Sequence, residues 1–305
     1  PRESGTDMSL NFHTPVRLTD VSRDFGPVKA LSNVTLSIPA GGTVGLLGPN
    51  GSGKTTMLSL IAGLREPTSG TVELFGADPR DRASRERLGV TPQQSGIVKE
   101  MKVLSMTRFI AGHYADHEDA ETLLEKFGIG QLSGKRIGGL SGGQQRLLSV
   151  ALAFAGRPRL VLLDEPSTGL DTMARNHLWD AIRRGARSGI TILLTSHYLE
   201  EVQELSDRII IIRENRIVAD GSTEKIIRNA ASTIVRVTTG DDRALSLPGV
   251  TAAHRKGAVV ELSVANPSTV LKSLGRAGIE YSDIDIIKPT LEDAFTHLAV
   301  EEQTS

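Results

Sequence analysis

Residues 48–55 read Gly-Pro-Asn-Gly-Ser-Gly-Lys-Thr, and this segment constrains the fold more than any other part of the chain. It fits the pattern G-x-x-x-x-G-K-[ST], follows a short apolar run at 43–48 and precedes a segment of helical character at 56–64. Glycines let backbone amides turn inward around phosphate oxygens, and the N-terminus of the following helix adds partial positive charge. The segment therefore predicts a phosphate-binding loop between a strand and a helix. The candidate binding residues are Gly48, Pro49, Asn50, Gly51, Ser52, Gly53, Lys54, Thr55 and Thr56.

Two carboxylates, Asp164 and Glu165, follow the apolar run at 160–163. In a parallel sheet, ligands bind beyond the carboxyl ends of the strands. We expect Lys54 to reach the β- and γ-phosphates of a nucleotide and Thr55 to ligate Mg²⁺. Asp164 is then expected to face the same metal, and Glu165 to polarise the attacking water.

A second glycine-rich segment, Leu-Ser-Gly-Gly-Gln at 140–144, opens a predicted helix at 141–155. Ser141 and Gln144 have the spacing of a capping box, in which each side chain bonds the backbone of the other residue. A capped helix does not need the two glycines, Gly142 and Gly143. Because paired glycines expose amide groups at a helix N-terminus, the segment also predicts a second anion-binding surface.

The hydrophobic pattern favours a mixed architecture. Alternating apolar and polar residues at 16–18 and 34–38 predict half-buried antiparallel strands. Continuous apolar runs that alternate with helices indicate an α/β fold, a parallel sheet with helices on its faces. The remaining strands are expected at 71–75, 159–163, 191–195, 209–212 and 216–219, the last two as a hairpin around Glu214 and Asn215. The remaining helices are expected at 118–127 and 173–184.

The order of the predicted strands and helices changes after residue 221. Strand-like and helix-like segments then mix, which predicts a small C-terminal α+β domain at 233–305. The strands are expected at 233–239, 258–264 and 281–287, and the helices at 267–276 and 291–300. Residues 1–14 are expected to form a flexible tail.

Composition excludes several classes of protein. The chain has no cysteine, so it has no disulfide scaffold, thiolate metal site or cysteine nucleophile. A net charge of -1 and 4% aromatic residues disfavour a nucleic-acid binder. No window approaches the ~18–20 apolar residues of a membrane span, so we expect a membrane role to come through a partner.

These motifs together resemble the ATPase subunits of ABC transporters. The resemblance covers roughly residues 15–222 and rests on the phosphate loop, 140–144, Leu-Val-Leu-Leu-Asp-Glu-Pro at 160–166, Gly-Leu-Asp at 169–171 and Ser-His at 196–197. It implies an ABC ATPase domain at 15–232 with a RecA-like core, an N-terminal antiparallel β subdomain and a helical subdomain inserted at about 95–157.

The resemblance also implies roles for single residues. Phe25 matches an aromatic residue that stacks on adenine, and Gln93 matches a glutamine that senses Mg²⁺ and links to the transmembrane partner. Asp171 matches an aspartate that crosses between subunits, and His197 matches a histidine that contacts the γ-phosphate. Thr172 and Gln94 depart from the common pattern, but no catalytic position does, so hydrolysis of ATP is expected.

Two segments point to an exporter. His-Tyr-Leu-Glu-Glu at 197–201 and Pro-Thr-Leu-Glu-Asp-Ala-Phe at 289–295 resemble drug-exporter ATPases of the daunorubicin-resistance type, which serve a separate permease. Taken by itself, the pair Thr290 and Asp293 also has the pattern of a helix N-terminus, with Thr290 as the N-cap. The alternatives are an importer ATPase with a regulatory C-terminal domain and a non-transport ABC ATPase. Importer extensions are often all-β, and non-transport members usually carry two cassettes, a coiled coil or a basic patch.

The resemblance also implies how the chain assembles with its partners. The two anion-binding segments are predicted to lie too far apart within one cassette to share a nucleotide. Two copies must then face each other head to tail, each giving residues 140–144 to the other's ATP, in a closed two-fold pair. The expected partners are a second copy and a membrane permease, without nucleic acid, at the cytoplasmic face of the cell membrane. The expected cofactors are ATP and Mg²⁺.

Overall fold

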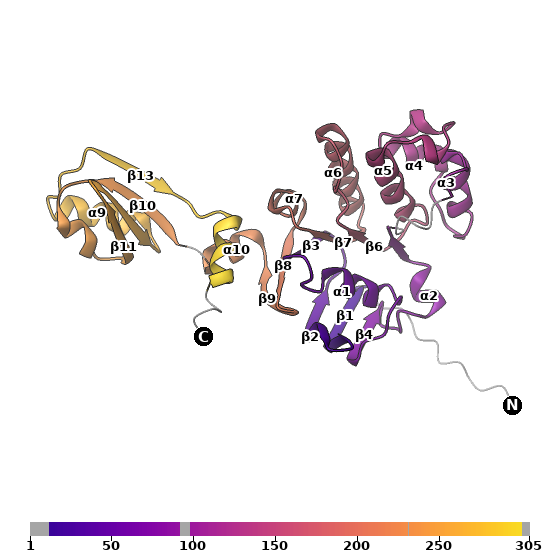
Figure 1. The fold of residues 1–305 in the computed structure, drawn as a ribbon, viewed down its shortest axis with the longest axis horizontal. Coiled ribbons are helices and arrows are strands. Elements are labelled where there is room, and N and C mark those ends of the chain that lie inside the picture. The colour runs from indigo at the N-terminus through magenta and orange to yellow at the C-terminus, as the bar shows by residue number, and fades with distance from the viewer. Residues whose placement is uncertain (1–11, 92–97, 231, 301–305) are drawn as a thin grey trace. The chain divides into compact units, whose positions relative to one another are not determined.

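The computed structural model describes residues 12–91, 98–230 and 232–300 (Figure 1). The chain divides into two compact units, Pro1–Asp220 and Gly221–Ser305. The predicted cassette boundary after residue 232 falls inside the second unit and stays a prediction. No helix in the described part of the chain is long and apolar enough to cross a lipid bilayer.

A six-stranded sheet in the order β5-β6-β7-β3-β8-β9 forms the centre of the first unit. Its first five strands run parallel, in the register Asp164↔Thr195 and Leu47↔Ser196 at their carboxyl ends. The inner strands β3, β6 and β7 are mostly apolar and almost entirely buried, as expected for parallel strands covered on both faces. The strands are β3 (Thr43–Leu47), β5 (Leu88–Val90), β6 (Leu160–Asp164), β7 (Thr191–Ser196), β8 (Arg208–Arg213) and β9 (Arg216–Gly221). Glu214 and Asn215 form the predicted two-residue hairpin between β8 and β9, both with positive φ.

An antiparallel sheet in the order β2-β1-β4 forms a second layer. Val16 pairs with Ile38 on one side and with Leu74 on the other, and burial alternates along the strands as the pattern predicts. Helix α1 (Lys54–Ile61) contributes Met57 and Ile61 to a hydrophobic core shared with both sheets. The three strands are β1 (Val16–Phe25), β2 (Val28–Ile38) and β4 (Ser69–Leu74).

Helix α1 (Lys54–Ile61) differs from the predicted span of 56–64. It begins earlier because Gly53, at φ 104°, turns the chain directly into the helix. It ends earlier because Gly63 adopts φ 67°, and the residue that follows, Leu64, is 69% exposed. Glycine is the residue that most easily adopts positive φ, so each end of the helix is fixed by a glycine.

Helices between β5 and β6 lie together in Figure 1, where the sequence predicts a helical subdomain. They are α3 (Val103–Ala111), α4 (Ala120–Lys126) and α5 (Gly142–Ala153), with 3₁₀ turns η2 (Gly130–Leu132) and η3 (Ile137–Gly139). The first unit also contains α2 (Arg82–Arg85), α6 (Thr172–Arg187) and α7 (Leu199–Leu205).

The second unit has the predicted α+β composition. Its antiparallel sheet has the order β11-β12-β10-β13, and α9 packs Val270 and Leu274 into its core. Strand β11 was not predicted, because its side chains are mostly exposed and show no apolar alternation. The elements are α8 (Thr223–Ala230), β10 (Thr233–Thr238), η4 (Asp242–Ser246), β11 (Val250–Lys256), β12 (Val259–Val264), α9 (Pro267–Arg276), β13 (Asp283–Ile287) and α10 (Leu291–Val300).

Candidate functional site

The loop between β3 and α1 wraps around the ammonium group of Lys54. Lys54 Nζ donates hydrogen bonds to the carbonyl oxygens of Gly48 at 2.7 Å and Pro49 at 3.0 Å. Its side chain is buried, and this burial lowers the pKa of Lys54, while the nearby carboxylates of Glu165 and Asp164 act in the opposite direction. The loop therefore holds a cation inside a backbone cradle.

Glycine is required at two positions of this cradle. A Cβ on Gly48 would lie 2.2 Å from the carbonyl oxygen of Ile212, and one on Gly53 would lie 2.3 Å from that of Ala30. Gly53 also has no side chain to cap α1, so the amides of the first helical turn have no side-chain acceptor there. The hydroxyl of Ser52 is buried without a hydrogen-bond partner among the described residues. The loop thus contains a hydroxyl and helix-start amides for which the described residues supply no side-chain acceptor.

The carboxylate of Asp164 joins this loop to the end of β6. Its Oδ2 accepts a hydrogen bond from Thr55 Oγ1 at 3.0 Å, and its Oδ1 accepts one from Thr195 Oγ1 at 2.6 Å. The structure thus brings Thr55 and Asp164 together, as the sequence predicts. Thr195, at the end of β7, belongs to the same cluster and was not predicted.

Glu165 adopts φ 46°, a left-handed conformation that is uncommon for residues other than glycine. Its amide donates to the carbonyl oxygen of Thr195 at 3.1 Å and to Thr195 Oγ1 at 2.9 Å. Its Oε1 lies 3.2 Å from Nδ1 of His197, and its Oε2 accepts from Thr168 Oγ1 at 3.3 Å. The two predicted residues, Glu165 and His197, are therefore in direct contact.

Residues 141–144 form the predicted capping box at the start of α5. The amide of Gln144 donates to Ser141 Oγ at 3.2 Å, and the amide of Ser141 donates to Gln144 Oε1 at 3.1 Å. Gly142 and Gly143 are the first two residues of the helix. Among the described residues, no hydrogen bond or ion pair joins this segment to the loop at 48–56.

Arg146, one turn further along α5, connects this helix to the carboxylate strand and was missed by the sequence analysis. Its guanidinium donates to the carbonyl oxygens of Asp164, of Glu165 at 2.8 Å and of Pro166 at 3.2 Å. Burial lowers the pKa of Arg146, opposed by the charges of Asp164, Glu165 and Glu201. The one available signal was a charged residue placed just before the apolar run that starts at Leu147.

The other predicted residues have separate surroundings. Phe25, at the end of β1, is 38% exposed, and the guanidinium groups of Arg23 and Arg65 lie 4.6 and 5.0 Å from its ring centroid. Asp171 caps α6 by accepting a hydrogen bond from the amide of Ala174 at 2.8 Å. Gln93 lies outside the described residues.

Known proteins are similar to this chain in sequence, and others in fold. A family model described as ABC transporter matches residues 31–168. The Nod factor export ATP-binding protein I of Burkholderia lata is 33% identical over 94% of this chain and 98% of its own length. The daunorubicin/doxorubicin resistance ATP-binding protein DrrA of Streptomyces peucetius is 31% identical over 93% of each chain.

The solved structures with a similar fold are also ATP-binding subunits or cassettes. An ATP-binding subunit of an ABC transporter matches with a TM-score of 0.64 and 27% identity, over 72% of this chain and 93% of its own. A dimeric ATP-binding cassette in a post-hydrolysis state, bound to ADP and Pi, matches with a TM-score of 0.61 and 25% identity, over 68% and 98%. The chain belongs to the ABC transporter family, as an ATP-binding subunit that hydrolyses ATP.

Proposed function

We propose that this chain powers export through a separate membrane permease, and that it hydrolyses ATP at the cluster around Asp164. The observation that carries the proposal is the hydrogen-bonded connection between the phosphate loop and the carboxylate strand, made by Thr55, Asp164 and Thr195. It places a binding loop for phosphates beside two carboxylates, which is the combination that phosphoryl transfer to water requires.

The loop residues fit the triphosphate of ATP. The unsatisfied hydroxyl of Ser52 and the uncapped amides after Gly53 are donors that phosphate oxygens can accept from. In this proposal Lys54 binds the β- and γ-phosphates, the backbone from Gly48 to Thr56 surrounds them, and Phe25 stacks on the adenine. Arg23 and Arg65, which already lie over the Phe25 ring, would border that base.

Mg²⁺ fits the oxygen donors of Thr55 and Asp164, and Gln93 is proposed as a further ligand. No group of three histidine or acidic side chains that could hold a metal occurs in the described part of the chain. One hydroxyl and one carboxylate suit Mg²⁺, which keeps several waters and binds substrate phosphates. When bound, this ion neutralises negative charge on the phosphates.

Glu165 is the proposed general base. Its carboxylate is held by Thr168 and His197, and its backbone by Thr195, so few orientations are open to it. We propose that it accepts a proton from the attacking water while His197 contacts the γ-phosphate. Positioning of the water and removal of its proton are the two contributions that this geometry supports.

A head-to-tail pair of two copies completes each site in this proposal. The amides of Gly142 and Gly143, with Ser141 and Gln144, would bind the nucleotide held by the other copy, and Asp171 would cross the same interface. The absence of described contacts between 141–144 and 48–56 in one chain supports an intermolecular role. The dimeric state named for the similar cassette supports it further.

The direction of transport is proposed from the relatives. Both sequence relatives are named for export or drug resistance. The α+β character of the second unit favours the same branch over an importer with an all-β extension. The proposed setting is therefore the cytoplasmic face of the cell membrane, beside a permease and without nucleic acid.

Replacement of Glu165 by glutamine should lower ATP turnover by about 10²–10⁴-fold, because the amide cannot accept the proton of water. ATP binding should be retained, since the phosphate contacts are untouched. Steady-state phosphate release and nucleotide titration measure the two quantities. Turnover at the wild-type rate by Glu165→Gln would disprove the assignment.

Lys54→Ala should weaken nucleotide binding or slow hydrolysis at least tenfold, because it removes a charged donor to phosphate oxygens. Fluorescent-nucleotide titration and phosphate release test this. Lys272→Ala, at an exposed position on α9, removes the same charge and should change neither value. If Lys54→Ala behaves like this control, the loop does not bind phosphate.

Ser141→Arg should prevent ATP-driven pairing without preventing ATP binding, because a bulky cation would occupy the surface that faces the other copy's nucleotide. Light scattering in the Glu165→Gln background reports pairing. Ser105→Arg, at an exposed site on α3, is the matched control and should still pair. If the Ser141→Arg protein pairs at the same ATP concentration as the protein with Ser141, the head-to-tail arrangement is refuted.

Arg146→Ala should reduce kcat about tenfold and leave the affinity for ATP unchanged. The variant lacks the guanidinium group that holds the backbone of residues 164–166 by donating to their three carbonyl oxygens. Arg146→Lys should recover part of the loss, since an ammonium group can reach fewer of these oxygens. A matching decrease in ATP affinity, or full activity in Arg146→Ala, would show that Arg146 does not position Glu165.

A further inference from the structure

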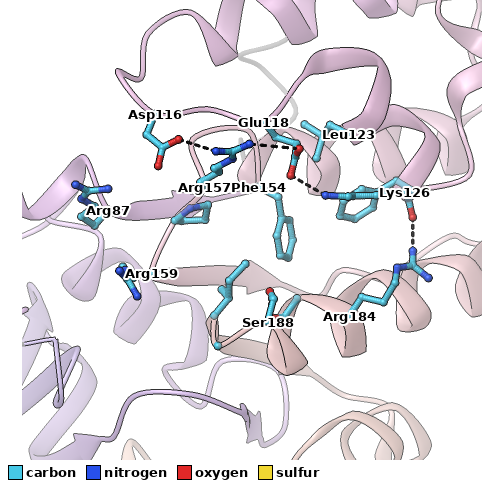
Figure 2. A pocket seen from close by; sticks show the side chains of 15 residues that line it. Arg87, Asp116, Glu118, Leu123, Lys126, Phe154, Arg157, Arg159, Arg184 and Ser188 are labelled. Atoms are coloured by element: carbon cyan, nitrogen blue, oxygen red, sulfur yellow. Dashed lines mark hydrogen bonds and ion pairs between the residues drawn. The ribbon is translucent and has the colours of Figure 1, made fainter.

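A pocket of about 450 Å³ lies at the amino ends of the parallel strands (Figure 2). Arg87 and residues 157–159, which lead into β5 and β6, form one side, together with Gly185 and residues 188–190 before β7. Helix α4 and the loop before it form the other side. Asp164 stands at the opposite end of β6, about 13 Å along a five-residue strand. The pocket is therefore separate from the proposed ATP site.

The acidic groups of the pocket wall are already paired. Arg157 Nη1 lies 3.0 Å from Asp116 Oδ1, and Lys126 Nζ lies 2.7 Å from Glu118 Oε2. Both ion pairs are drawn in Figure 2. Each of these two carboxylates is therefore paired with a cation. Among the described residues, no further carboxylate lines the pocket to neutralise its other cations.

Three arginines of the wall, Arg87, Arg159 and Arg184, have no carboxylate partner among the described residues. The amide of Arg159 donates to the carbonyl oxygen of Arg87 at 2.8 Å, so two like charges are held on neighbouring backbone segments. Arg184 donates to the backbone carbonyl of Lys126 and stands on the far side of Phe154 from Arg159 in Figure 2. The guanidinium of Arg159 also lies 5.7 Å from the ring centroid of Phe12. An anion bound at this wall would meet arginines whose charge no described carboxylate neutralises.

The floor between the arginines is aromatic and apolar. Phe154 and Phe127 lie with ring centroids 5.3 Å apart, and Leu123 and Ile190 complete the lining. The nearby end of α6 does not repel an anion with free carbonyl groups, because the amides of residues 188–190 bond the carbonyls of 184–186. The site thus combines a cationic rim with an apolar floor made largely of two tilted aromatic rings.

We propose that this pocket binds a small organic anion, with a phosphate, sulfonate or carboxylate at the arginines and an aromatic or apolar body against Phe154. Guanidinium groups pair with such oxyanions through two parallel hydrogen bonds. The volume lies within the ~300–1,000 Å³ range of small-molecule sites. The occupant would join α4 to the end of α6, the two elements that the bond from Arg184 to Lys126 already links.

The test uses the full chain and the probe 8-anilinonaphthalene-1-sulfonate, an aromatic sulfonate whose fluorescence rises on binding. The double variant Arg87→Ala/Arg159→Ala should bind it at least tenfold more weakly than the wild type. Arg82→Ala/Arg85→Ala, on exposed neighbouring positions, removes the same charge and should bind it within twofold of the wild type. Both double variants should hydrolyse ATP at the wild-type rate, because neither changes the proposed ATP site.

Displacement of the probe by other small molecules then shows whether the pocket prefers an anionic group. Phenyl phosphate should displace the probe, neutral benzyl alcohol at the same concentration should not, and inorganic phosphate should do so more weakly than phenyl phosphate. Equal affinity of the Arg87→Ala/Arg159→Ala protein and the wild type would overturn the proposal. Displacement by benzyl alcohol as effective as by phenyl phosphate would also overturn it, because the pocket would then be an apolar patch without anion selectivity.

Discussion

Two threonine hydroxyls donate hydrogen bonds to the carboxylate of Asp164 and connect the loop after β3 to the ends of β6 and β7. One comes from Thr55, 109 residues earlier in the chain, and the other from Thr195, 31 residues later. In the sheet, β7 lies between β6 and β3, so the loop after β3 must reach over the end of β7 to approach Asp164. Thr195 stands at that end, directly across from Asp164 in the parallel register, and bonds it there. The position of the loop proposed to bind phosphate therefore depends on the alignment of three strand ends.

The same alignment supports a strained backbone at Glu165. A non-glycine residue at positive φ costs on the order of 1–3 kcal/mol and persists where its surroundings fix it. Here Thr195 accepts and Arg146 donates, so both the amide and the carbonyl of Glu165 are bonded. The strain sits at the residue proposed as the general base, and the bonds that stabilise it come from β7 and from α5.

Much of this could be predicted from sequence because the informative residues are contiguous. The phosphate loop, the capping box at Ser141 and Gln144 and the apolar strand before Asp164 each lie within a few residues, so local spacing identifies them. Contacts made by chain topology could not be predicted in the same way. The bonds from Arg146 to residues 164–166 and from Thr195 to Asp164 depend on how the sheet is ordered, which no local pattern records. Strand β11 was missed for a related reason: it has one pairing neighbour and little apolar area.

Arg146 also bears on how two sites of a pair would act together. Ser141 and Arg146 stand on one helix, about 7.5 Å apart along its axis. In the proposed head-to-tail pair, Ser141 meets the other copy's nucleotide while Arg146 bonds the backbone of its own Glu165. A rigid-body shift of α5 toward one nucleotide would then move the support of the base that acts on the other. In such a pair each copy's α5, through its three hydrogen bonds to residues 164–166, would link one proposed site to the other.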